Sequence, residues 1–97
     1  MKLNFSVGDY VDTKINGYAH IVDILKSDTS DRTAVCVEFT YNFPNPRGFD
    51  IMIFTSEKTY GMDQWFVVDK KLFDDALMEK ATALVNKASE RINERNL

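Results

Sequence analysis

The stretch TAVCVEFTY, residues 33–41, is the clearest strand signal in this chain. Val35, Val37, Phe39 and Tyr41 alternate with smaller or polar side chains, so one face of an extended segment is apolar. A period of two is that of a half-buried β-strand. We therefore predict a strand here and interpret the neighbouring segments relative to it.

The residues that follow predict the tip of a hairpin. Pro44 and Pro46 cannot donate ladder hydrogen bonds, and Gly48 permits a positive φ. Residues 42–48 are therefore expected to form the bend.

The returning strand, FDIMIFTS at residues 49–56, is apolar on both of its faces. Ile51 and Ile53 share one face, and Met52 and Phe54 share the other. Both faces then need a cover: one lines the core, and the other requires a helix, a second sheet or a partner. We expect a C-terminal helix to cover Met52 and Phe54.

Upstream, two further strands are expected around a tight turn. FSVGDYVDTKI, residues 5–15, alternates apolar and polar positions and ends at the turn dipeptide Asn16-Gly17. In YAHIVDILK, residues 18–26, the alternation is broken, which predicts a β-bulge or a strand covered on both faces. The polar run SDTSDR, residues 27–32, is expected to be an exposed loop.

A short final strand, WFVV at residues 65–68, leads into the only segment with a helical pattern. Asp69 is a suitable N-cap, and residues 70–96 contain neither Gly nor Pro. About 26 helical residues span roughly 39 Å, whereas strands of six residues are only about 20 Å long. The distal half therefore either folds across the sheet or projects to meet a second subunit. The residues expected in such a homodimer are Leu84, Val85, Ala88 and Ile92.

The chain of 97 residues, 44% of them hydrophobic and 28% charged, has the composition of one ordinary globular domain. We assign residues 1–97 to a single α+β domain, with the β part at 5–68 and the helix at 69–96. No apolar run is long enough for a membrane span, and residues 1–7 lack the pattern of a secretory signal, so a cytoplasmic location is expected.

Chemistry-bearing residues are few. The chain has one Cys, Cys36, and one His, His20, so neither a disulfide within the chain nor a Cys/His zinc site is expected. No Gly-rich phosphate loop and no calcium-loop spacing occur. We therefore expect no metal, no cofactor and no catalytic activity.

The segment FSVGDYVDTKINGYAHIVDI, residues 5–24, resembles the first hairpin of SH3-like small barrels of the Tudor and KOW type. The resemblance implies an antiparallel five-stranded barrel or strongly curved sheet, and a binding function rather than catalysis. A methyl-lysine reader would need an aromatic cage. The candidates by residue type are Tyr10, Tyr18, Tyr41, Phe43 and Trp65.

The aromatic residues around the hairpin tip give the favoured functional interpretation. Tyr41, Phe43, Arg47 and Phe49 would form a pre-ordered patch that binds a larger protein, since aromatics and Arg dominate interface hot spots. The chain would then be a non-catalytic interaction module, such as a small regulator or inhibitor. In the structural alternative, Phe43 and Phe49 fold inward over the mouth of the barrel.

Charge suggests two other functions. Residues 1–69 carry ten acidic against six basic side chains, and the whole chain has a formal charge of −3. An acidic decoy, of the sort mobile elements such as phages use against host defences, would mimic nucleic acid through Asp12, Asp23, Asp28 and Asp31. Weak, salt-sensitive nucleic-acid binding through the helix is the second alternative, and it would use Lys87, Arg91 and Arg95.

Overall fold

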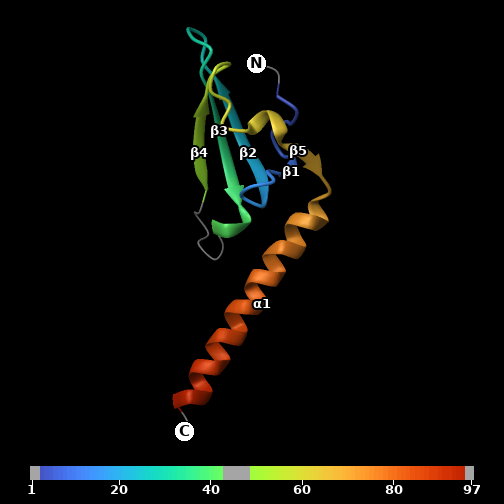
Figure 1. Ribbon diagram of the computed structural model, residues 1–97, viewed down its shortest axis with the longest axis vertical. Helices are drawn as coiled ribbons and strands as arrows, with labels where there is room; N and C mark the ends of the chain where they lie inside the picture. The colour runs from blue at the N-terminus through green and yellow to red at the C-terminus, as the bar shows by residue number, and fades with distance from the viewer. Residues whose placement is uncertain (1–2, 43–48, 96–97) are drawn as a thin grey trace.

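The computed structural model describes residues 3–42 and 49–95. They form a five-stranded antiparallel sheet followed by one long helix, so the predicted α+β class is confirmed (Figure 1). The strand order is β4-β3-β2-β1-β5, and the sheet stays open rather than closing into a barrel. The elements are β1 (Tyr10–Asp12), β2 (Tyr18–Lys26), β3 (Thr33–Phe39), β4 (Asp50–Phe54), β5 (Phe66–Val68) and α1 (Lys70–Arg95), with short 3₁₀ helices η1 (Thr40–Asn42) and η2 (Met62–Gln64).

The first strand is much shorter than the alternation predicts. A turn precedes β1: the Ser6 amide donates to Asp9 Oδ2 at 2.8 Å, and Gly8 has a φ of 93°. That left-handed conformation favours glycine and interrupts an extended chain. Phe5 is nevertheless buried, so its side chain joins the core from outside the sheet.

The broken alternation in β2 is a β-bulge, which confirms one of the two predicted explanations. The β2–β3 register shifts between Ile21 and Asp23, which leaves Val22 as the extra residue. Because of the shift, both Ile21 and Ile24 face the core although they are three positions apart.

The core lies against one face of the sheet. Val35, Val37 and Phe39 of β3 are buried there, as their alternation predicts. Since β4 and β5 occupy opposite edges of the sheet, the chain between them has to cross this face (Figure 1). Met62 and Trp65 of that crossing segment are buried in the core.

The prediction that the helix covers Met52 and Phe54 is wrong. Phe54 is buried in the core and Met52 packs against it, both on the face that the crossing segment covers. It is Ile51 and Ile53 that point to the other face, where both are exposed. The helix makes its main contacts with β2 and η1.

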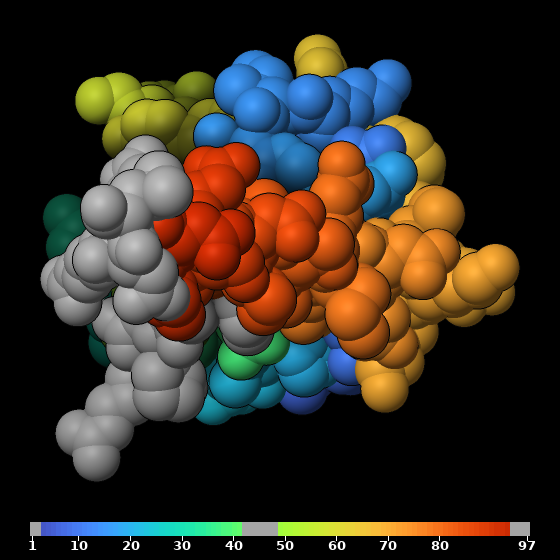
Figure 2. Space-filling view, turned by 90° about the horizontal axis from the view of Figure 1, so that it is seen from below, coloured from blue at the N-terminus to red at the C-terminus, as the bar shows by residue number. Residues whose placement is uncertain are grey.

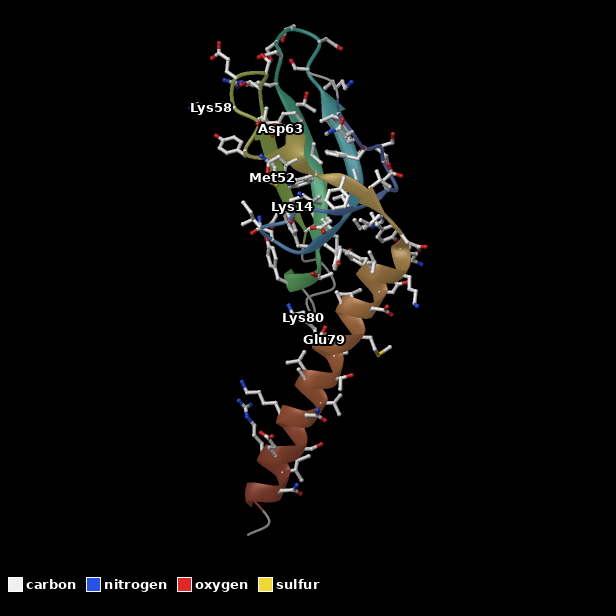
Figure 3. All side chains as sticks on the ribbon, turned by 45° about the vertical axis from the view of Figure 1, so that its right-hand side comes forward. Lys14, Met52, Lys58, Asp63, Glu79 and Lys80 are labelled. Atoms are coloured by element: carbon white, nitrogen blue, oxygen red, sulfur yellow. The ribbon has the colours of Figure 1, made fainter. Side chains whose placement is uncertain are left out.

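The helix begins at the predicted cap and is held to the sheet near its start. The Lys71 amide donates to Asp69 Oδ1 at 3.0 Å. Phe73 is buried with its ring edge-on to Tyr10, at 5.1 Å between centroids. About two turns later, Lys80 Nζ points to the β unit and donates to the carbonyl oxygen of Thr40 at 3.2 Å (Figure 3).

Beyond this contact, α1 extends away from the sheet (Figure 1). The molecule is accordingly elongated, with extents of 63 × 24 × 19 Å. Viewed from below, the side chains of α1 stand in front of the β unit (Figure 2). Within the described ranges, the structure contains no helix with the length and apolarity needed to cross a membrane.

Candidate functional site

An apolar surface crosses three strands on the face of the sheet opposite the core. The register places Leu25 of β2 beside Ala34 of β3, and Ala34 beside Ile53 of β4. In the next row of this face, Cys36 pairs with Ile51. We call this surface the open-face patch, and it consists of Leu25, Ala34, Cys36, Ile51 and Ile53.

The large side chains of the open-face patch are mostly in solvent. Leu25, Ile51 and Ile53 are 64%, 63% and 58% exposed, while Ala34 and Cys36 between them are half-buried. Leu25 and Ile53 flank Ala34, while Cys36 lies between Ile51 and the exposed Asp23. This gives a shallow apolar surface that is suited to contact with another apolar surface.

The helix leaves this patch bare because it reaches only the other end of the same face. Tyr10 and His20 are cross-strand partners on β1 and β2, and their rings stack at 4.5 Å. Their neighbours Val11 and Ala19 point to the core, so Tyr10 and His20 lie on the face that carries the patch. Phe73 of α1 packs on this pair and covers the face there.

Cys36 contributes to the patch as a small apolar group. Burial raises the pKa of its thiol, and the negative charge of Asp23, its cross-strand partner, raises it further. A thiol with a raised pKa stays protonated at neutral pH and is a poor nucleophile. The side chain therefore suits packing better than covalent chemistry.

The predicted aromatic patch is only partly within the described residues. Tyr41 is half exposed; its ring stacks on Phe39 at 4.8 Å, and its hydroxyl donates to Asp50 Oδ2 at 2.6 Å. Phe49 is also half exposed, and so does not fold inward. The other two residues of the prediction, Phe43 and Arg47, lie outside the described residues. The patch thus stays a prediction, with two of its members at the surface.

The phenol of Tyr41 has a strongly raised pKa. Partial burial of Tyr41 and its hydrogen bond to the charged Asp50 raise the pKa of the phenol to about 12. The phenol therefore stays neutral and keeps donating throughout the physiological range. This bond ties η1 to the first residue of β4.

The candidates for a methyl-lysine cage are in separate environments. Trp65 is buried in the core, between Phe5 at 5.7 Å and Phe39 at 6.1 Å. Tyr10 packs against His20 and the helix, as described above. Tyr18 is half-buried and Tyr41 stacks on Phe39, while Phe43 falls outside the described residues. A cage that uses the face of Trp65 is therefore not formed.

The predicted acidic surface consists largely of carboxylates with local structural roles. Asp31 Oδ2 accepts hydrogen bonds from the hydroxyl and the amide of Ser56, at 2.8 and 3.2 Å, and these bonds lower its pKa. Asp12 accepts from the Lys14 amide, and Asp23 from the amide that follows it. Asp28 is exposed in the loop after β2. The structure thus gives three of the four a local hydrogen-bonding role.

The distal half of α1 is a second exposed apolar surface. Leu84, Val85 and Ile92 are exposed, and Leu84 and Ile92 line a shallow groove together with Lys87, Ala88 and Arg91. Two of the three predicted basic residues therefore lie among the predicted dimer residues. The third, Arg95, has its side chain outside the described part of the chain.

Comparisons with models of protein families, with curated proteins and with solved structures gave no match. The surfaces of the molecule therefore carry the functional argument. Sequence reasoning missed the open-face patch, although it noted that Ile51 and Ile53 share a face. The cross-strand register, which adds Leu25 to them, is not visible in a single segment.

Proposed function

We propose that this chain is a protein-interaction module that binds a larger protein through the open-face patch. The observation that carries the proposal is the row of Leu25, Ala34 and Ile53 across three strands, which the helix leaves uncovered. Contiguous apolar surface of this kind is rare on soluble proteins outside interaction sites. Removing it from water on binding provides the driving force.

The position of β4 indicates how a partner engages. β4 is the last strand of the order and is paired on one side by β3, so its other edge can accept a further strand. We therefore expect the partner to supply an extended segment with alternating apolar side chains. Its backbone would pair along β4, and its apolar side chains would contact Ile51 and Ile53.

The aromatic residues at the start of β4 would enlarge this surface. Phe49 directly precedes the strand and is half exposed, and Tyr41 is tied to Asp50 by its hydroxyl. Phe49 would lie at one end of an added strand, on the face of Ile51 and Ile53. Tyr41 lies on the core side, where its ring stacks on Phe39. Phe49 of the predicted contact patch and the open-face patch would then form parts of one binding surface, consistent with a small regulator or inhibitor.

The two alternatives from charge make a different prediction about salt. A nucleic-acid mimic, or a nucleic-acid binder using Lys87 and Arg91, would lose its target steeply as ionic strength rises. Binding through the open-face patch would change little over the same range, since its contacts are apolar. No described contact favours either alternative over the apolar surface.

The test is capture of a partner from the native cells with matched variants as bait. We expect the wild type and the control Ile15→Ser to retain the same protein, because Ile15 is exposed far from the patch in the β1–β2 turn. The double variant Ile51→Ser, Ile53→Ser should lose it. Equal retention by the double variant, or release of the protein at moderate salt, would contradict the proposal.

A further inference from the structure

The exposed part of α1 carries a broad apolar stripe that continues for four turns. Ala81 and Ala88 recur seven residues apart and mark its centre line. One flank carries Leu77 and Leu84, and the other carries exposed large side chains at the same seven-residue spacing. These are Met78, Val85 and Ile92.

The flank of the stripe formed by Met78, Val85 and Ile92 is distinct from the surface that holds the helix to the sheet. Phe73 and Lys80 contact the β unit, and at 100° per residue they lie about 100–140° around the helix from Val85 and Ile92. Leu77 and Ala81 adjoin them and are half-buried. Beyond Lys80, α1 extends clear of the sheet (Figure 1). The exposed flank of the stripe is thus accessible to a second molecule along about 21 Å of helix, from Met78 to Ile92.

The order of residues along the stripe is self-complementary when reversed. In an antiparallel pair with its twofold axis beside Leu84 and Val85, each of these two residues meets its own copy. Ala81 then faces the partner's Ala88, and Met78 faces the partner's Ile92. Small residues meet on the centre line, where helices need to approach closely, and larger ones meet on the flanks.

An antiparallel pair has two further advantages over a parallel one. The antiparallel arrangement opposes the two helix dipoles favourably, whereas a parallel one aligns them. It also places each β unit at the opposite end of the paired helices, because Phe73 of one chain lies beyond residue 95 of the other. The bulky ends of the two chains are then kept apart.

We propose that the occupant of this stripe is a second copy of the chain, and that the protein forms an antiparallel homodimer through α1. This surface is separate from the open-face patch, so the dimer would present two open-face patches. The proposal therefore stands or falls independently of the partner-binding function.

The first test compares assembly of matched variants by sedimentation equilibrium over a wide range of concentrations. Val85→Glu, Ile92→Glu adds two charges to the stripe, and Asn86→Glu, Asn93→Glu adds the same charges one residue further on, outside it. All four positions are exposed in the protomer, so each variant should keep its helical circular dichroism.

We expect the wild type and the asparagine variant to dimerise alike. The stripe variant should dissociate at least about 100-fold more readily, since each Val or Ile side chain would be replaced twice per dimer. A wild type that stays monomeric at every concentration, or a stripe variant that dimerises as well as the wild type, would overturn the proposal.

The second test fixes the orientation by disulfide cross-linking. Ala81→Cys and Ala88→Cys are introduced separately into chains that carry Cys36→Ser, and the two chains are mixed and oxidised. An antiparallel pair predicts cross-links between the two different chains, because position 81 then faces position 88. Cross-links mainly between identical chains would show parallel pairing and overturn the arrangement.

Discussion

The two faces of β4 are equally apolar in sequence and entirely different in the structure. Phe54 is 2% exposed, whereas its neighbour Ile53 is 58% exposed. The segment between β4 and β5 crosses one face and buries it with Met62 and Trp65. Among residues 3–42 and 49–95, α1 is the element that packs on the other face, and it covers that face at Tyr10 and His20. Apolar composition alone therefore does not decide which face of β4 is buried. The segment of chain that packs across a face decides it.

The difference between the two faces is tested most strongly by shortening one side chain on each face of β4. We expect Phe54→Ala to lower the free energy of unfolding by about 3–5 kcal/mol, because it leaves a cavity in the core. Ile53→Ala should change it by no more than about 0.5 kcal/mol, since its side chain is mostly in solvent. Urea denaturation of both variants measures this. Similar losses in the two variants would show that both faces are covered.

On the face that carries the open-face patch, the end at Tyr10 and His20 is covered by the helix, and this contact should contribute to stability. We expect Phe73→Ala to cost about 3 kcal/mol, because Phe73 is buried against the Tyr10–His20 pair. Leu72→Ala, at the more exposed preceding position, should cost less than about 1 kcal/mol. The measurement is again urea denaturation. If the two costs were equal, the helix would not be held through Phe73.

The N-cap at the start of α1 is a further test, because it fixes where the helix begins beside the sheet. Asp69→Ala removes the acceptor for the Lys71 amide and should cost about 1 kcal/mol in thermal unfolding. Asp69→Asn should keep most of this stability, because Asn is also a good N-cap. Asp74→Ala is the control, and it should cost no more than about 0.5 kcal/mol, since its ion pair with Lys70 is exposed. A neutral Asp69→Ala would contradict the capping role.

The smallest expected effect concerns the hydrogen bond between Tyr41 and Asp50 at the start of β4, and it depends on pH. Because folding raises the pKa of Tyr41 to about 12, from about 10 in the unfolded chain, the folded state binds this proton more tightly. Its contribution to stability is fully present below pH 10 and is lost as the pH rises through 12. In Tyr41→Phe this part of the loss should disappear from unfolding measured between pH 9 and 12. An unchanged pH profile would show that the bond to Asp50 does not form.

Local patterns predicted much of the fold, and the arrangement between segments was beyond them. The alternation of β3, the bulge in β2 and the cap at Asp69 each depend on a few neighbouring residues. The strand and the cap were predicted, and the bulge was one of two explanations predicted for β2. Which face of β4 is buried was not predicted, because apolar residues at every position of a strand favour neither face. The open-face patch was missed for the same reason, since it combines strands that are distant in sequence.

Solvent accessibility of the isoleucine methyl groups reports directly on whether this face of the sheet is open. In NMR spectra with a soluble paramagnetic probe, Ile15 provides an exposed reference and Ile21 a buried one. We predict that the methyl groups of Ile51 and Ile53 relax nearly as fast as that of Ile15. Protection of both at the level of Ile21 would mean that this face of the sheet is covered within the chain, and would contradict an open docking surface.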